Sequence, residues 1–170
     1  TEALTNILWA PLENGLKSVS LSANWMWPCK NPGEDARLYE AVKGISEFAI
    51  ALGINVPTGK DSLSMKQKYP EGDVLSPGTV VISAAAHCNG ISKVVEPLFK
   101  TNQGPVYYIN ISQDNFKLGG SSFAQILNSI GQQTPKVKSA KYVKSVFNTL
   151  QHLIQNKQIV AGHDIASGGL

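Results

Sequence analysis

Three oxygen-bearing side chains near the ends of the sequence are the first candidates for chemistry. Glu2 and Asn6 are four residues apart, so on a helix their carboxylate and amide oxygens share one face and could both reach a hard cation such as Mg²⁺. Asp164 follows a predicted strand, where a carboxylate can face a ligand cleft, and is a third candidate oxygen ligand. An exposed surface pair and an Asx turn or helix cap use the same residue types, so the residues alone leave both interpretations open. We interpret the neighbouring His163 as a packed, hydrogen-bonded core histidine.

Lys60, Asp61 and Ser62 follow Gly59 in a predicted loop and form a second candidate site. A P-loop needs glycine at position 54 and serine or threonine directly after the lysine, and the sequence has Ile54 and Asp61 there, which excludes a Walker motif. A short glycine loop with these side chains can still line an anionic ligand. A plain turn with a solvated lysine stays open as the alternative.

The turn Leu118–Ser122 offers backbone N–H groups ahead of a predicted helix, which suits either an anion cradle or an ordinary turn with an N-cap. The sequence contains no evident Ser/His/Asp or Cys/His arrangement, so no catalytic residue is assigned. Its two cysteines lack the CxxC spacing of a zinc site and are too few for a disulfide framework. We therefore expect a reducing, cytoplasmic location.

The hydrophobic pattern alternates between strands and helices. The clearest helix is predicted over residues 35–52, where apolar residues recur at three- and four-residue spacing until Gly53. This alternation predicts an α/β (α+β) fold with mixed sheets packed against helices. The other expected elements are a helix end at 1–10, strands at 18–26, 54–56, 79–86, 106–111 and 159–161, a loop at 57–62, a polar excursion at 69–78, and helices at 122–130 and 142–156.

Charge divides the 170 residues unevenly and indicates a domain boundary. Residues 1–96 hold eight basic and ten acidic side chains, whereas residues 97–170 hold seven basic and two acidic ones. Prolines and glycine gather near the change, so we predict domains at 1–95 and 105–170 joined by a linker at 96–104. The lysines of the basic part are scattered along a helical stretch without arginine or exposed aromatic neighbours, which argues against nucleic-acid binding. No apolar run is long enough for a membrane span.

Both ends of the sequence suggest a fragment. It starts at Thr1 inside a helical pattern, and it stops at Leu170 where a strand-to-turn motif normally opens a helix. We therefore expect an incomplete active site.

Taken together, six motifs in register resemble one family. They are the runs at 2–6 (EALTN), 21–26 (LSANWM), 32–36 (PGEDA), 59–65 (GKDSLSM), 118–121 (LGGS) and 163–170 (HDIASGGL). In order and spacing they resemble phosphoribosylformylglycinamidine synthase, the large single-chain enzyme of purine biosynthesis. The resemblance covers the whole chain and is closest to the second of that family's two aminoimidazole-ribonucleotide-synthetase-like halves.

The resemblance implies two partial synthetase-like domains and a set of ligands. Glu2, Asn6 and Asp164 match family residues that hold Mg²⁺ on a bound ATP or ADP. Lys60, Asp61 and Ser62 lie in a run characteristic of the second half. Ala166 stands where the family has a serine that contacts the nucleotide, which puts that contact in question.

By this resemblance the parent is an ATP-dependent carbon–nitrogen ligase and glutamine amidotransferase. It converts formylglycinamide ribonucleotide, glutamine, ATP and water to formylglycinamidine ribonucleotide. The implied partners are the nucleotide, the ribonucleotide substrate and the remaining domains of the parent, including its glutaminase, with neither nucleic acid nor membrane among them. Alone, the fragment is expected to be inactive. The alternative is a non-catalytic module of the same enzyme that holds a structural nucleotide.

Overall fold

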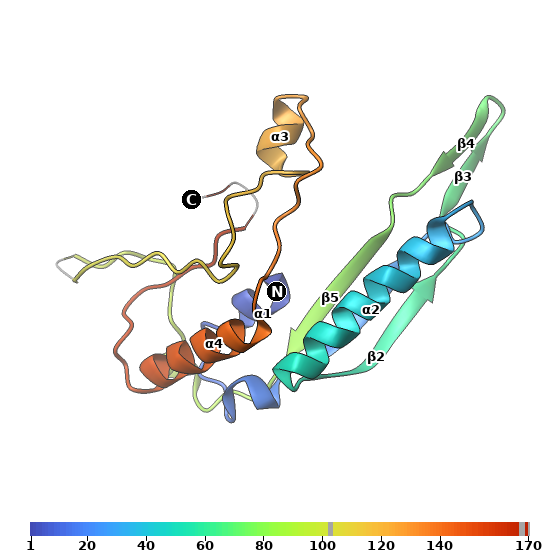
Figure 1. Cartoon of the computed structure of the whole chain (residues 1–170). Helices are drawn as coiled ribbons and strands as arrows, with labels where there is room; N and C mark the ends of the chain where they lie inside the picture. Colours follow the sequence, from blue (N-terminus) through green and yellow to red (C-terminus); the bar gives the residue numbers. More distant parts are fainter. Residues whose placement is uncertain (102–103, 167–168, 170) are drawn as a thin grey trace. The chain divides into compact units, whose positions relative to one another are not determined.

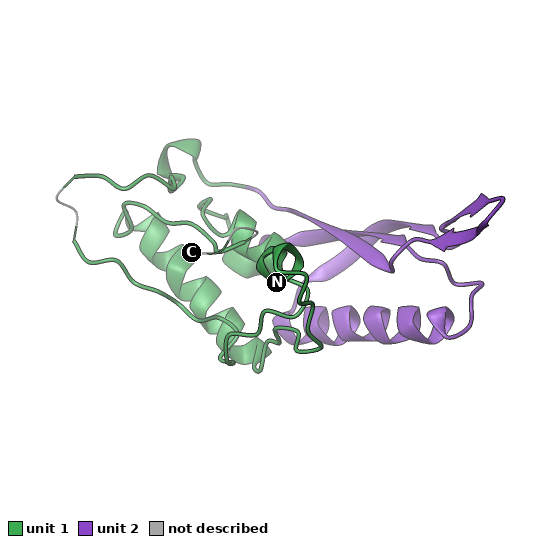
Figure 2. Cartoon of the chain, turned by 90° about the horizontal axis from the view of Figure 1, so that it is seen from above, with its two compact units in different colours: residues 1–16, 88–170 green, residues 17–87 purple. Residues whose placement is uncertain are grey.

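The computed structural model describes residues 1–101, 104–166 and 169 (Figure 1). Its helices and mixed sheet confirm the predicted α/β (α+β) class. Two compact units are coloured separately in Figure 2: unit 1 comprises residues 1–16 and 88–170, and unit 2 comprises residues 17–87. In chain order the elements are α1 (Glu2–Ile7), η1 (Gly15–Ser18), β1 (Ser20–Met26), α2 (Glu34–Leu52), β2 (Asn55–Ser62), β3 (Lys66–Tyr69), β4 (Gly72–Leu75), β5 (Thr79–Ala85), η2 (Ile91–Lys93), α3 (Ser122–Ile126) and α4 (Ala140–Gln155).

Unit 2 is built on a three-stranded sheet in the order β2-β1-β5. β1 pairs in parallel with β2 and antiparallel with β5, and α2 provides the connection that two parallel strands require. Burial alternates along β1, so Ala23 and Trp25 point to one side and pack with Trp27 into a core cluster. Leu38, Ala41 and Ile45 of α2 pack against the same cluster. One face of the sheet is therefore covered by α2, as the apolar periodicity of residues 35–52 predicts.

The predicted loop over residues 57–62 is wrong, because these residues continue the strand as β2. Pro57 is tolerated for two reasons. β2 lies at the edge of the sheet, and the pairing register between β1 and β2 shifts between Ser20 and Ser22, which leaves an irregularity beside the proline. Gly59 lies opposite Ala23, and a Cβ at this position would collide with the Ala23 carbonyl oxygen. The glycine therefore serves close strand pairing rather than a phosphate-binding turn.

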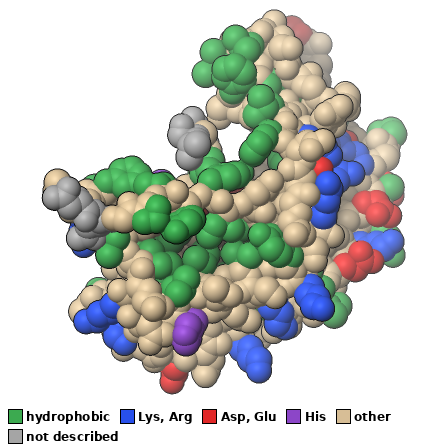
Figure 3. Space-filling model, turned by 60° about the vertical axis from the view of Figure 1, so that its left-hand side comes forward, with side chains coloured by type: hydrophobic (Ala, Val, Ile, Leu, Met, Phe, Trp, Pro, Cys, Tyr) green, Lys and Arg blue, Asp and Glu red, His purple; other side chains and the backbone are tan. Residues whose placement is uncertain are grey.

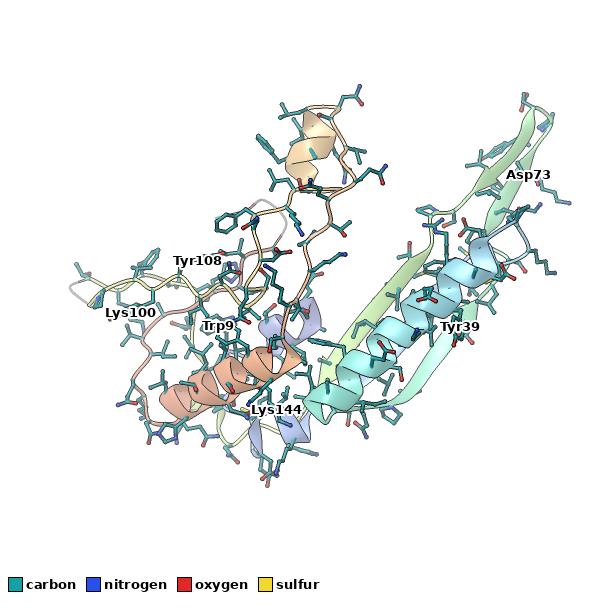
Figure 4. The ribbon with its side chains drawn as sticks, viewed as in Figure 1. Trp9, Tyr39, Asp73, Lys100, Tyr108 and Lys144 are labelled. Atoms are coloured by element: carbon teal, nitrogen blue, oxygen red, sulfur yellow. The ribbon has the colours of Figure 1, made fainter. Side chains whose placement is uncertain are left out.

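The polar excursion predicted at 69–78 contains part of a two-stranded hairpin formed by β3 and β4. Lys66 Nζ lies 2.5 Å from Asp73 Oδ2 across the hairpin, and Figure 4 shows Asp73 near its far end. All residues of both strands are exposed, so cross-strand pairing rather than burial holds this hairpin.

Unit 1 contains α1, α3 and α4 joined by long irregular segments. The predicted helices at both ends of this unit are confirmed in α1 and α4, and the predicted helix at 122–130 is shorter, ending at Ile126. Val143, Phe147, Leu150 and Ile154 form the buried stripe of α4. They share the core of the unit with buried leucines at positions 4, 8, 12 and 16.

The strands predicted at 106–111 and 159–161 are absent from the described part of the chain. A strand is stable only when its backbone groups pair with a neighbour, and neither segment pairs with another described segment. Both segments are apolar, but without a neighbouring strand they leave several large side chains exposed, including Val106 at 76% and Tyr107 at 79%.

The two compact units do not follow the predicted division at 96–104, since residues 1–16 group with residues 88–170. The predicted division concerns domains of a longer fold, so the boundaries 1–95 and 105–170 stay a prediction. Within the described ranges, no helix combines the length and the apolar character needed to cross a membrane.

Candidate functional site

The first helix presents two of the predicted ligands on one side. Glu2 and Asn6 both lie in α1, one turn apart and exposed, while Leu4 is buried on the opposite side. Neither the Glu2 carboxylate nor the Asn6 amide forms a hydrogen bond or ion pair with another residue that the structure describes. Burial of Leu4 thus sets the rotation of α1, and the two oxygen donors stay open to a ligand.

Asp164 lies in an irregular segment rather than at the end of a strand. Its side chain is only 9% exposed, and His163 Nδ1 lies 3.5 Å from its Oδ1. The His163 side chain itself is 72% exposed, so the interpretation of His163 as a core histidine is wrong. The histidine side chain is thus open to solvent, whereas the carboxylate beside it is sheltered. Ala166 follows as an exposed residue.

A tryptophan links the chain after α1 to the chain before Asp164. Trp9, labelled in Figure 4, lies so close to Gly162 that any Cβ on Gly162 would collide with the indole ring. Backbone hydrogen bonds join the same segments, with Val95 N donating to Trp9 O at 2.9 Å and Gly162 N donating to Glu96 O at 3.2 Å. Gly162 is thus required by a close approach, two residues before the predicted ligand Asp164.

A buried glutamine of α4, Gln151, binds the backbone that follows α1. The sequence analysis did not identify this residue. Gln151 is 4% exposed. Its Nε2 donates to Leu8 O at 2.6 Å and Ala10 O at 2.9 Å, and its Oε1 accepts from Leu12 N at 2.8 Å. One signal was available, because position 151 follows Phe147 by four residues and so falls on the apolar stripe. A polar residue at a core position needs a specific partner.

Side chains alternate between the two faces of a strand, so the residues of the second candidate site, which lie in β2, point to opposite sides of the sheet. Lys60 Nζ donates to Ser62 Oγ at 2.9 Å, and both side chains lie on the sheet face opposite α2. Asp61 pairs in register with Trp25 and so belongs to the other face. The structure therefore brings Lys60 and Ser62 together and separates Asp61 from them. These residues belong to unit 2, whereas Ala166 belongs to unit 1.

The glycine turn at 118–121 serves as a helix cap. Ser121 Oγ accepts from Ala124 N at 3.2 Å, which is the N-cap alternative that the sequence left open.

The donor set of unit 1 fits a hard cation. Glu2, Asn6 and Asp164 supply two carboxylates and one amide oxygen, the donor type that Mg²⁺ prefers. In the described ranges no cluster of three or more His, Cys, Asp or Glu side chains could hold a metal ion. Glu2, Asn6 and Asp164 offer too few oxygens to complete the coordination of Mg²⁺, so the remaining ligands must be phosphate or water oxygens.

Comparison with known proteins bears on the whole chain. The family described as "FGAR-AT PurM_N-like domain" matches residues 1–87, more than half of the sequence. The chain belongs to this family. It is 41% identical over 172 residues to a probable phosphoribosylformylglycinamidine synthase, chloroplastic/mitochondrial, of Arabidopsis thaliana, covering 99% of the chain and 12% of that protein. It is 39% identical over 181 residues to a probable phosphoribosylformylglycinamidine synthase of Caenorhabditis elegans, covering 99% of the chain and 14% of that protein.

The chain thus spans about one eighth of the length of these two synthases. The family and the two relatives bear out the resemblance drawn from the six motifs. The family match ends at residue 87, so among the predicted metal ligands it includes Glu2 and Asn6 but not Asp164. The roles of all these residues stay predictions.

In this FGAR-AT PurM_N-like chain a strong electrostatic interaction lies away from the predicted ligands, at a turn of unit 1. Asp114 has a side chain only 6% exposed, with Lys117 Nζ at 2.7 Å and Lys138 Nζ at 3.0 Å from its two oxygens. Hydrogen bonds from Lys117, from Lys138 and from the backbone N–H of Asn115 hold the pKa of the Asp114 carboxyl well below its usual range. The cluster joins residue 138, just before α4, to the turn at 112–117.

Asp114→Asn should lower the free energy of unfolding at pH 7, and its difference from the unmodified chain should shrink as the pH falls below about 4. The folded-state pKa lies below the unfolded-state pKa, so the charged form stabilises the fold above the unfolded value. This contribution is lost as the pH falls through the folded value. Urea unfolding at a series of pH values measures it.

Asp73→Asn is the matched control, because the Lys66 hydrogen bond also lowers the pKa of Asp73, but at an exposed hairpin. Its effect should be smaller at every pH. A loss in Asp114→Asn that stays constant from pH 7 to pH 3 would show that the ion pairs contribute nothing.

Proposed function

We propose that the chain is part of a phosphoribosylformylglycinamidine synthase that contributes to holding a Mg²⁺-bound nucleotide. The observation that carries this proposal is the identity of about 40% to two such synthases along 99% of the chain. The parent's reaction is the ATP-dependent conversion of formylglycinamide ribonucleotide to formylglycinamidine ribonucleotide, with glutamine as the source of ammonia. ATP phosphorylates the formamide oxygen, and ammonia then displaces the phosphate.

Glu2, Asn6 and Asp164 are the residues proposed to hold the cation. When bound there, Mg²⁺ supplies positive charge that offsets the negative charge of the nucleotide phosphates. Two features support the assignment: the exposed oxygens of Glu2 and Asn6 on one side of α1, which accept no hydrogen bond from the described residues, and the sheltered carboxylate of Asp164. Ala166 offers no hydroxyl, so this chain lacks the side-chain hydrogen bond that a serine there gives the nucleotide.

Lys60 and Ser62 are proposed to bind an anionic group on the open face of the sheet in unit 2. Their hydrogen bond orients the lysine ammonium beside a hydroxyl, and both groups donate hydrogen bonds to phosphate oxygens. Asp61 faces the other side of the sheet and is proposed only to support the strand end.

The exposed apolar surface supports a place in a longer polypeptide. Large hydrophobic side chains are exposed along residues 98–130 of unit 1, including Phe99 at 84%, Phe116 at 79% and Ile126 at 83%. Figure 3 shows hydrophobic side chains gathered on the face that this view presents. Surfaces of this kind are normally covered by protein. We propose that other domains of the parent, including the glutaminase, are its partners in a cytoplasmic enzyme that binds neither nucleic acid nor membrane.

An activity assay tests the proposed function. The full-length polypeptide should form formylglycinamidine ribonucleotide from its substrate, ATP and glutamine, whereas the 170-residue chain should form none, even with ammonia supplied. Product formation is measured by chromatography. A full-length protein that binds Mg²⁺-ADP but lacks this activity would contradict the assigned reaction, and ADP that exchanges only slowly would favour a structural nucleotide.

Glu2→Gln and Asn6→Ala in the full-length protein should each raise the Mg²⁺ concentration needed for half-maximal ADP binding. Ligands of one ion are coupled, so the double variant should lose less than the sum of the two single losses in binding free energy. Isothermal titration calorimetry at several Mg²⁺ concentrations measures this.

Glu13→Gln removes an exposed carboxylate beyond α1 and should leave the Mg²⁺ requirement unchanged. Strictly additive losses, or losses that do not depend on Mg²⁺, would mean that Glu2 and Asn6 do not share an ion.

A further inference from the structure

The segment that follows α1, residues 8–12, is held mostly by groups distant in the sequence. We call it the connecting segment. It forms neither helix nor extended strand, and local bonds pair only part of its backbone: Leu8 N donates to Leu4 O at 3.1 Å and Ala10 N donates to Ile7 O at 3.2 Å. Leu8, Pro11 and Leu12 are nevertheless buried. Buried backbone of this kind is stable only when other parts of the chain supply hydrogen bonds.

Two glutamines one turn apart on α4 supply these bonds on one side. The Gln151 amide binds the segment at three backbone atoms, those of Leu8, Ala10 and Leu12. Gln155 Nε2 adds a bond to Leu12 O at 2.8 Å. Lys93 Nζ lies 3.3 Å from Gln155 O, at the end of the same helix. A primary amide can donate twice and accept once at such short range, which an apolar side chain of the same size cannot do.

On its other side the connecting segment touches the chain that leads to Asp164. Trp9 accepts from Val95 through its carbonyl oxygen, and its ring fills the space left by the missing side chain of Gly162. Glu96 O accepts from Gly162 N. The segment is therefore in contact with α4 through its backbone and with residue 162 through its indole.

These contacts connect the segment to both parts of the proposed metal site. At its beginning it continues α1, which carries Glu2 and Asn6, and through Trp9 it contacts residue 162, two positions before Asp164. We infer that Gln151 is a positioning residue that fixes α1 relative to Asp164 by holding the connecting segment, and so tunes the affinity of the site for Mg²⁺. This inference rests on the proposed function.

Gln151→Met in the full-length protein tests the inference, because methionine keeps the length of the side chain and removes all three hydrogen bonds. The Mg²⁺ concentration for half-maximal ADP binding should rise by between about 10-fold and about 100-fold, the range seen when a group that orients a metal ligand is lost. Hydrogen exchange of the Leu12 amide, measured without Mg²⁺ or nucleotide, should also accelerate.

Leu150→Ala is the matched control for stability, since Leu150 is buried in the same helix and makes no hydrogen bond to the connecting segment. At a comparable loss in melting temperature its Mg²⁺ requirement should change by no more than about twofold, the scatter between independent sites. If Gln151→Met changes the Mg²⁺ requirement no more than Leu150→Ala does, Gln151 is merely structural and the inference is wrong.

Two further variants show whether a negative result concerns the positioning role of Gln151 or the proposed metal site. Gln155→Met removes only the bond to Leu12 O, so it should shift the Mg²⁺ requirement in the same direction by less, and it replaces Gln151→Met if that variant does not fold. Glu2→Gln tests the metal site itself. A shift in Glu2→Gln without one in the glutamine variants overturns the positioning role alone, whereas no shift in any variant overturns the proposed metal site and the inference with it.

Discussion

The side-chain amide of Gln151 is the interaction on which the arrangement of unit 1 depends. It lies in the core, where an amide without partners is costly, and all of its hydrogen bonds go to the backbone of residues 8–12. Apolar burial along α4 is non-directional, whereas three hydrogen bonds to specific backbone atoms fix the position of the segment relative to the helix. The direction in which α1 leaves the core follows from that position, and so does the placement of Glu2 and Asn6.

In unit 2 the main constraint is that α2 covers only one face of the three-stranded sheet. Burial of Ala23 and Trp25 under α2 fixes the pleat of the sheet, and the pairing register transmits it to β2. Lys60 and Ser62 therefore must lie on the face opposite α2. A shift of one residue in β2 would bring Asp61 to that face instead, so the irregularity in pairing beside Pro57 determines which side chains of the motif are available to a ligand.

Much of the fold could be predicted from periodicity, but some of the candidate site could not. Helices α2 and α4 follow directly from apolar residues at three- and four-residue spacing. Proline and glycine made residues 57–62 look like a loop, because their tolerance at a sheet edge depends on pairing that one sequence does not reveal. Gln151 was overlooked since its partners lie about 140 positions away in the chain. The shared face of Glu2 and Asn6, in contrast, is local geometry and needed only the helix. His163 is exposed while its neighbour Asp164 is sheltered, an arrangement that the residue types alone do not reveal.

The most direct test of this account is to locate the cation itself. Mn²⁺ can replace Mg²⁺ at oxygen sites, and its anomalous scattering would mark its position in crystals of the full-length protein grown with ADP. The account predicts one peak about 2.1 Å from carboxylate oxygens of Glu2 and Asp164 and from the amide oxygen of Asn6, completed by phosphate and water. A Mn²⁺ peak bound to the nucleotide but remote from these three side chains would contradict it.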